Sequence, residues 1–224
     1  MTSETFNSGR QTLKITVCPA PADRKRHPIV LLVHGNFGLG PPYGDQIRGF
    51  GESIAKLGYV AAVPQLYEDE APHPNDIDPD PHVETVSAAI AKIASRGDAD
   101  PDRIGLVGFS LGAAAAMTYI ASTAHSEVKA LADFFGPLTP TIRAGVGKFP
   151  PTIIFHNKND GVVPIGFSVE LDRLLPSSID HRLIRYDELS PPGNHAFRPG
   201  GAADLDSREK AKDWFAAHIP PIGR

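Results

Sequence analysis

The chain has 224 residues, 41% of them hydrophobic, and its 22 basic and 26 acidic side chains give a net charge of −4. This length fits one α/β domain with a sizeable core, so we predict a single domain over residues 1–224. The mild charge, without a basic patch, argues against a nucleic-acid-binding protein.

The cysteine content and the N-terminal sequence bear on the cellular compartment. Cys18 is the single cysteine, so an internal disulfide is excluded and a reducing environment is compatible with the sequence. Residues 1–19 lack the apolar core of a signal peptide, and no apolar run approaches the roughly 20 residues of a membrane helix. We therefore expect a cytoplasmic protein that does not bind membranes.

Short apolar runs, rich in Val, Ile and Phe, recur along the chain and mostly do not alternate with polar residues. Such continuous runs are typical of strands in a parallel sheet that is covered on both faces. Residues 13–17 are expected to form an N-terminal edge strand, and the run at residues 181–186, which does alternate, is expected nearer the sheet edge. The predicted strands are residues 13–17, 29–33, 59–63, 104–107, 130–135, 152–155 and 181–186.

Helical patterns lie between these runs. Helices are predicted within residues 47–57, 83–93 and 206–218, and after residue 110. Asp206 and Glu209 stand three apart, which predicts a capping box at the start of the last helix. The alternation predicts a doubly wound, mostly parallel α/β sheet with helices on both faces. In such folds, ligands bind beyond the carboxyl ends of the strands.

The most specific motif is G-x-S-x-G at residues 108–112, directly after an apolar strand and directly before an alanine-rich segment. In this context the serine occupies a strained strand-to-helix turn, which projects its hydroxyl above the sheet. The free N–H groups at the start of the helix favour developing negative charge. We predict that Ser110 is a nucleophile; the structural alternative is a glycine-rich turn with an N-cap serine.

A nucleophilic serine needs a base and an acid that orients the base, in the chain order serine, acid, histidine for this kind of turn. His195 is the predicted base, because it lies in a loop between the last predicted strand and the last helix. A surface loop histidine is the alternative. Of the other histidines, His218 is expected to pack, His181 to lie at the opposite end of the sheet, and His156 to precede the best acid.

Two aspartates are candidates for the acid. Asp160 follows the strand at residues 152–155, in a loop whose turn is fixed by Gly161 and Pro164, and we favour it. An Asx turn is the noncatalytic alternative for Asp160. Asp133 lies near the end of the preceding strand and remains the rival, although its apolar neighbours indicate that it points into the sheet packing.

The loop at residues 33–40 ends an early strand and contains three glycines. One oxyanion-hole N–H comes from such a loop and the other from the residue after the nucleophile. We assign the two donors to the backbones of Asn36 and Leu111. His34 is expected to order the loop by hydrogen bonding, with a role as base as the alternative.

Five segments within residues 28–215 are similar to the motifs of a known enzyme family, and they occur in the same order as in that family. They are His34-Gly-Asn-Phe-Gly, residues 58–67, Gly108-Phe-Ser-Leu-Gly, Asp160-Gly-Val-Val-Pro and Asn194-His-Ala-Phe. Together they resemble the dienelactone hydrolase family. The resemblance implies an α/β-hydrolase fold in a small single-domain enzyme without a cofactor or a large lid domain. The family's nucleophile, acid and base positions fall on Ser110, Asp160 and His195.

Two positions depart from the family pattern. Well-known dienelactone hydrolases carry a cysteine where this chain has Ser110, and a glutamate that interacts with the thiol where it has Gly35. The differences agree with each other, because a serine paired with histidine needs no thiol-controlling carboxylate. They weaken an assignment of dienelactone itself as the substrate. Arg198 is a candidate partner for a substrate carboxylate or a solvated surface residue, and Phe37 is a further candidate substrate contact.

An acidic segment at residues 68–82 holds six carboxylates and two histidines. Its prolines and its lack of ligand spacing argue against a metal site, so we predict none. We expect a solvated loop or a short flap over the pocket.

These features predict a serine hydrolase that cleaves small esters or lactones by two-step acyl transfer, without a cofactor. One alternative is a broad short-acyl carboxylesterase or thioesterase. Another is a noncatalytic α/β-hydrolase scaffold that binds a ligand, which the fold alone would not distinguish. The expected partner is a small-molecule substrate, and monomer and dimer both stay open.

Overall fold

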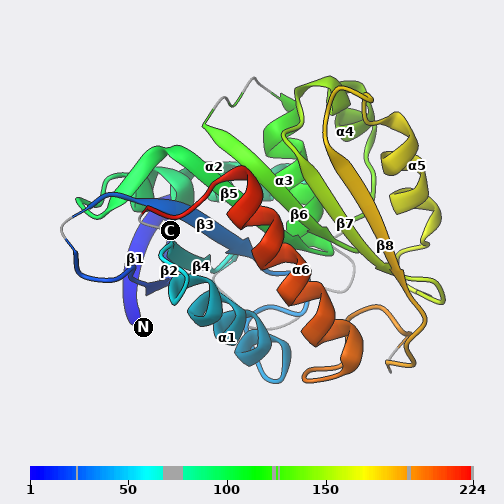
Figure 1. The fold of residues 1–224 in the computed structure, drawn as a ribbon, viewed down its shortest axis with the longest axis horizontal. Helices are drawn as coiled ribbons and strands as arrows, with labels where there is room; N and C mark the ends of the chain where they lie inside the picture. The colour runs from blue at the N-terminus through cyan, green and yellow to red at the C-terminus, as the bar shows by residue number, and fades with distance from the viewer. Residues whose placement is uncertain (24, 68–77, 123–124, 126, 191–192, 223–224) are drawn as a thin grey trace.

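The structure of the protein, a computed structural model, describes residues 1–23, 25–67, 78–122, 125, 127–190 and 193–222. Its centre is an eight-stranded sheet with the strand order β1-β2-β4-β3-β5-β6-β7-β8 (Figure 1). The strands from β3 onward are parallel, whereas β1 and β2 form an antiparallel ribbon that pairs with β4. The strands are β1 (Thr2–Ser8), β2 (Gln11–Cys18), β3 (His27–Val33), β4 (Val60–Pro64), β5 (Ala99–Phe109), β6 (Val128–Phe134), β7 (Thr152–Asn157) and β8 (His181–Tyr186).

Helices cover both faces of the sheet, with α1 and α6 on one side and α2 to α5 on the other (Figure 1). The central strands are therefore buried on both faces: in β3, Leu31 contacts one layer and Leu32 the other. This burial explains the continuous apolar runs and confirms the predicted doubly wound arrangement. The helices are α1 (Tyr43–Ala55), α2 (Asp80–Ala94), α3 (Leu111–Ser122), α4 (Pro140–Gly145), α5 (Gly166–Leu174) and α6 (Ala202–His218), and a 3₁₀ turn spans Val146–Lys148.

The capping box predicted for the last helix is wrong. Helix α6 begins at Ala202, after Gly201, and no side chain caps its start. Asp206 lies within the helix and accepts a hydrogen bond from the Tyr186 hydroxyl, while Glu209 pairs with Lys212. The spacing of the two acids therefore reflects contacts along the helix and to β8, not a helix start.

One strand and two α-helices were not predicted from the sequence, for two different reasons. Strand β1 is an edge strand whose residues are mostly exposed, so it lacks an apolar run. Because β1 pairs with β2, the strand at residues 13–17 is not an edge strand, and that expectation is wrong. Helices α4 and α5 have 6 and 9 residues, which is too short for a clear helical period. Within the described residues, no helix is long and apolar enough to cross a membrane.

Candidate active site

Ser110 lies in the turn between β5 and α3, next to the point where the strand order reverses. Strand β3 is flanked by β4 and β5, so the loops after β3 and β5 meet at the carboxyl edge of the sheet. Ser110 has a φ of +54°, a left-handed conformation that is uncommon for a residue with a side chain. Its N–H donates to the Phe134 carbonyl at 2.9 Å. The structure therefore has the strained turn that the motif predicts.

The glycines of the motif bring α3 close to the neighbouring loop. A Cβ on Gly112 would overlap the carbonyl oxygens of Val33 and His34, and a Cβ on Gly108 would overlap the backbone of Ala113. A side chain at Gly112 would push α3 away from the end of β3, and one at Gly108 would push α3 away from β5. Glycine is required here by close approach of the backbones.

This close approach predicts opposite effects for two Gly→Ala substitutions. Gly112→Ala is expected to lower the free energy of unfolding by about 1–3 kcal/mol or more, because backbone atoms occupy the place of the new methyl group. Gly49→Ala in α1 is the matched control, since a Cβ there meets nothing within 4 Å. It is expected to stabilise the protein by about 0.5–1 kcal/mol. Urea unfolding measures both, and equal effects would contradict the packing argument.

A continuous chain of hydrogen bonds links Ser110 to Asp160 through His195. Ser110 Oγ lies 2.8 Å from His195 Nε2, and His195 Nδ1 lies 2.6 Å from Asp160 Oδ2. Because an ionised carboxylate only accepts, Nδ1 carries the proton and Nε2 accepts from the serine hydroxyl. His195 is 3% exposed, so the middle of this chain is shielded from bulk water. The fold thus brings together the three residues that the sequence singled out.

Asp160 is held in its ionised form by several donors. Its Oδ1 accepts from the N–H groups of Val162 and Val163, at 2.8 Å each, so the turn contacts expected of an Asx turn coexist with the contact to His195. Burial alone would raise the pKa of Asp160, but hydrogen bonds from His156 and His195 hold it well below its usual range. A permanently charged Asp160 can stabilise a protonated His195.

His156 is a second histidine at Asp160. Its Nε2 lies 2.8 Å from the Val163 carbonyl oxygen and 3.2 Å from Asp160 Oδ2, and its Nδ1 lies 2.6 Å from Ser168 Oγ. Nε2 therefore carries the proton and points at the carbonyl and the carboxylate. His156 is fully buried and both of its nitrogens are engaged, so it fixes the position of Asp160 and is not placed to act as the base.

Asp133 lies at the end of β6 but makes a different contact. Its side chain is 0% exposed, and Oδ1 accepts from the Gly136 N–H at 2.9 Å. Burial raises the pKa of Asp133 to about 6, against smaller opposite effects of the Gly136 N–H and His156. The carboxylate bonded to His195 is that of Asp160, the acid that the sequence favoured.

The raised pKa of Asp133 predicts a pH-dependent stability. The folded-state pKa of about 6 exceeds the ordinary value of 3.8, so protonation of Asp133 stabilises the folded state. Its contribution to the free energy of unfolding is full below about pH 4 and is lost as the pH rises through 6. Asp133→Asn keeps the acceptor and removes the charge. It is expected to raise the free energy of unfolding on the order of 3 kcal/mol at about pH 8, and by little at about pH 4. Urea unfolding at both pH values measures this, and a pH-independent difference would refute it.

The loop after β3 is ordered by His34. Burial lowers the pKa of His34 to about 4, so the ring is neutral. Its Nδ1 donates to the Gly35 carbonyl at 2.7 Å, and its Nε2 accepts from the Leu66 N–H at 2.9 Å. Both nitrogens are occupied, which supports the ordering role and not that of a base. The Tyr67 hydroxyl donates to the Asn36 carbonyl at 2.7 Å and fixes the next peptide.

Gly35 packs directly against the serine turn. A Cβ at this position would lie 2.9 Å from the Phe109 carbonyl oxygen and 3.1 Å from Ser110 Cβ. A side chain such as the glutamate of well-known dienelactone hydrolases would therefore force the loop away from Ser110. The glycine and the serine fit each other sterically as well as chemically.

Ser110 borders a small cavity with a volume of about 40 Å³. Its walls are mainly apolar, and no arginine or lysine is among the described residues that line it. Phe37 belongs to this wall, is 46% exposed and stacks on Tyr43 with ring centroids 5.9 Å apart. The apolar side chains of the wall are Phe37, Tyr43, Ile47, Phe109, Phe135 and Ala196. The sequence interpretation missed Phe135, although its position at the carboxyl end of a predicted strand was a signal.

The other candidate residues lie elsewhere. Arg198 is exposed and is not among the described residues of the cavity wall. His181 opens β8 at the opposite end of the sheet, as expected, and its ring contacts the Ile179 carbonyl. His218 packs on Trp214, with ring centroids 4.4 Å apart.

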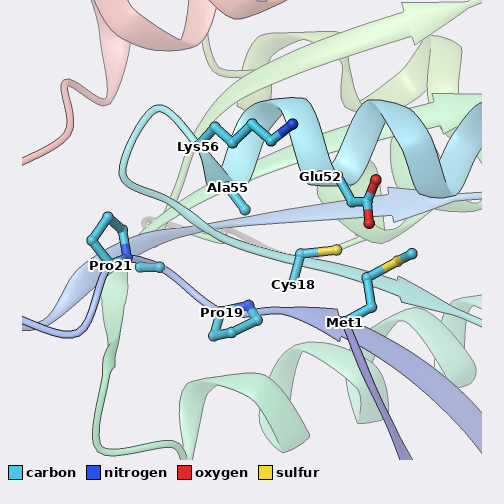
Figure 2. A pocket seen from close by; sticks show the side chains of 8 residues that line it. Met1, Cys18, Pro19, Pro21, Glu52, Ala55 and Lys56 are labelled. Atoms are coloured by element: carbon cyan, nitrogen blue, oxygen red, sulfur yellow. The ribbon is translucent and has the colours of Figure 1, made fainter.

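A larger hollow, of about 360 Å³, lies at the end of β2 and beside α1 (Figure 2). The side chains that line it include Met1, Cys18, Glu52 and Lys56. Cys18 is buried, and desolvation raises the pKa of its thiol, which disfavours the reactive thiolate. No serine or histidine lines this hollow among the described residues, so the smaller cavity at Ser110 is the candidate active site.

Most of the acidic segment, residues 68–77, lies outside the described residues, so the predicted flap cannot be placed. The remainder of the segment leads into α2. The described part of the chain contains no group of three His, Cys, Asp or Glu side chains that could hold a metal ion.

Comparison with known proteins identifies relatives over almost the whole chain. The sequence profile described as "Dienelactone hydrolase family" matches residues 15–219. A Synechocystis protein named "Putative carboxymethylenebutenolidase" is 26% identical over 215 residues, which cover 84% of this chain and 83% of the relative.

Solved structures agree with this relationship at the level of the fold. A dienelactone hydrolase from Anabaena variabilis superposes with a TM-score of 0.75 at 20% identity, covering 97% of both chains. A thermophilic esterase from Thermogutta terrifontis with bound propionate gives a TM-score of 0.76 at 17% identity, covering 100% of this chain and 96% of the other. The chain therefore has the α/β-hydrolase fold of these enzymes.

Proposed function

Because the chain belongs to the dienelactone hydrolase family, we propose that it is a serine hydrolase that cleaves small esters or lactones through an acyl-enzyme on Ser110. The observation that carries this proposal is the unbroken hydrogen-bonded chain from Ser110 through His195 to Asp160. A scaffold that only bound a ligand would not require a serine, a neutral imidazole and an ionised carboxylate in this order.

In the first step, Ser110 Oγ forms a bond to the substrate carbonyl carbon while its proton moves to His195 Nε2. The tetrahedral intermediate then collapses: the bond to the alcohol oxygen breaks, and His195 returns the proton to that oxygen. In the second step, water forms a bond to the acyl carbon while His195 Nε2 accepts its proton; the bond to Ser110 Oγ then breaks, His195 returns the proton to Oγ, and the acid product leaves. Asp160 stays ionised throughout and stabilises the imidazolium. The reaction uses only side chains, backbone and water.

The oxyanion of each tetrahedral intermediate is proposed to accept hydrogen bonds from the N–H groups of Leu111 and Asn36. Leu111 is the first residue of α3, where the helix N-terminus favours negative charge. Asn36 follows Gly35, whose lack of a side chain lets the loop approach Ser110. Loss of one such donor typically lowers kcat by ~10²–10³.

The cavity indicates which substrates fit best. Its small volume and apolar walls favour short acyl groups, and the absence of a lysine or arginine among its described wall residues favours uncharged substrates. The propionate bound to the Thermogutta terrifontis esterase agrees with a short-acyl carboxylesterase, the second candidate activity. The name of the Synechocystis relative favours lactones.

A substrate panel tests the proposal. Nitrophenyl esters of graded acyl length are compared with a carboxylated enol lactone by initial rates. We expect the highest kcat/KM for acetate to butyrate esters and a lower value for the charged lactone. A preference for long acyl chains would argue against a small-substrate hydrolase, and no turnover of any ester would refute the proposed activity.

A further inference from the structure

Phe135 has an unusual backbone conformation. It follows directly after β6 and has a φ of +50°, in the left-handed region that large side chains rarely adopt. Such conformations persist where the surrounding structure imposes them, and they cluster at functional sites. Ser110 has the same kind of conformation after the neighbouring strand β5. Both residues therefore stand at adjacent positions on the carboxyl edge of the sheet.

Two hydrogen bonds fix this turn. The Phe135 N–H donates to the Phe155 carbonyl at 2.8 Å, and the Gly136 N–H donates to Asp133 Oδ1 at 2.9 Å. Gly136 has no room for a side chain, because a Cβ would lie 2.6 Å from Asp133 Oδ1 and 2.7 Å from Met117 Cε. Asp133, which the proposed reaction does not use, thus holds the peptide that follows Phe135.

The turn places the Phe135 ring in the wall of the cavity beside Ser110. The ring centroid lies 4.8 Å from that of His195 with an interplanar angle of 62°, and 5.4 Å from that of Phe197. The residue is only 4% exposed. The ring is therefore packed between its neighbours and cannot swing aside to admit a larger group without disturbing the imidazole.

We propose that Phe135 is a specificity-determining residue, whose ring sets the size limit for the substrate group next to the scissile carbonyl, and that Asp133 is the positioning residue that holds this ring in place. This inference rests on the proposed ester hydrolysis at Ser110. It gives a role to a buried carboxylate that lies outside the Ser110–His195–Asp160 chain.

The first test measures how acyl-chain preference depends on Phe135. The readout is the ratio of kcat/KM for nitrophenyl octanoate to that for nitrophenyl acetate. Phe135→Ala is expected to raise this ratio about tenfold or more, and Phe135→Leu to raise it less, because each opens space in the wall. Phe155→Leu is the matched control: Phe155 is equally buried but does not line the cavity, so its ratio should stay that of the wild type. Unchanged ratios in both folded Phe135 variants would overturn the inference.

The second test separates the hydrogen bond between Asp133 and the Gly136 N–H from general packing. Asp133→Ala removes the acceptor of the Gly136 N–H and is expected to raise the octanoate-to-acetate ratio. Asp133→Asn keeps an acceptor oxygen and is expected to restore the wild-type ratio. Equal ratios in the alanine and asparagine variants would refute the positioning role of Asp133.

A binding measurement keeps this inference distinct from the proposed activity. In the Ser110→Ala background, the dissociation constants of the same two esters are measured by calorimetry with and without Phe135→Ala. Relative binding of the octanoate should improve about tenfold when the ring is removed, even if turnover proves undetectable. A failure of turnover alone would refute the serine hydrolase proposal, whereas unchanged relative binding would refute the size limit.

Discussion

Ser110→Ala is expected to lower kcat for the best nitrophenyl ester by about 10⁴–10⁶. The hydroxyl that lies 2.8 Å from His195 Nε2 is the proposed nucleophile, and the alanine leaves the cavity wall and the oxyanion-hole backbone in place. KM should therefore change much less than kcat. Steady-state kinetics measure both, with circular dichroism and thermal unfolding as controls for the fold. A variant that keeps more than about a tenth of wild-type kcat would exclude Ser110 as the nucleophile.

Mass spectrometry provides an independent readout of the same prediction. During turnover of a slowly deacylated ester, the wild type should carry a mass increase equal to the acyl group, located on the peptide that contains Ser110. Ser110→Ala should show no such adduct. An adduct on another residue would point to a different nucleophile.

Much of the architecture follows from the sequence because burial leaves a clear pattern in it. The runs within β3 to β7 are mostly apolar, since helices cover them on both faces. The turn at Ser110 was readable because its glycines are required by backbone contacts at fixed positions. Strand β1 left no such pattern, because an edge strand with exposed residues needs no apolar run.

The identity of the acid could be favoured but not settled from the sequence. Asp133 and Asp160 both lie at or just beyond the carboxyl end of a strand, and β6 and β7 are neighbours. The two differ in side-chain direction: one accepts from Gly136 within its own turn, and the other reaches His195. Such directions depend on the backbone conformation of the turns. The left-handed conformation of Phe135 is likewise invisible in the residue letters.

The different contacts of the two carboxylates predict that Asp160→Asn and Asp133→Asn lower kcat by different amounts. In the wild type, the Val162 and Val163 N–H groups bind Oδ1 of Asp160, so an asparagine amide oxygen should take that place. The amide NH₂ would then face His195 Nδ1 and force it to accept. The proton of the neutral imidazole would move to Nε2, which could no longer accept from Ser110. The expected loss in kcat is ~10⁴.

Asp133→Asn is the matched substitution, because it makes the same chemical change at a carboxylate bonded to Gly136 and not to His195. Its loss in kcat should be smaller than that of Asp160→Asn by at least ~100-fold, since the tautomer of His195 is unaffected. Both variants are assayed with the same short-acyl ester at the same pH. A greater loss in Asp133→Asn would move the role of the acid from the loop after β7 to the end of β6.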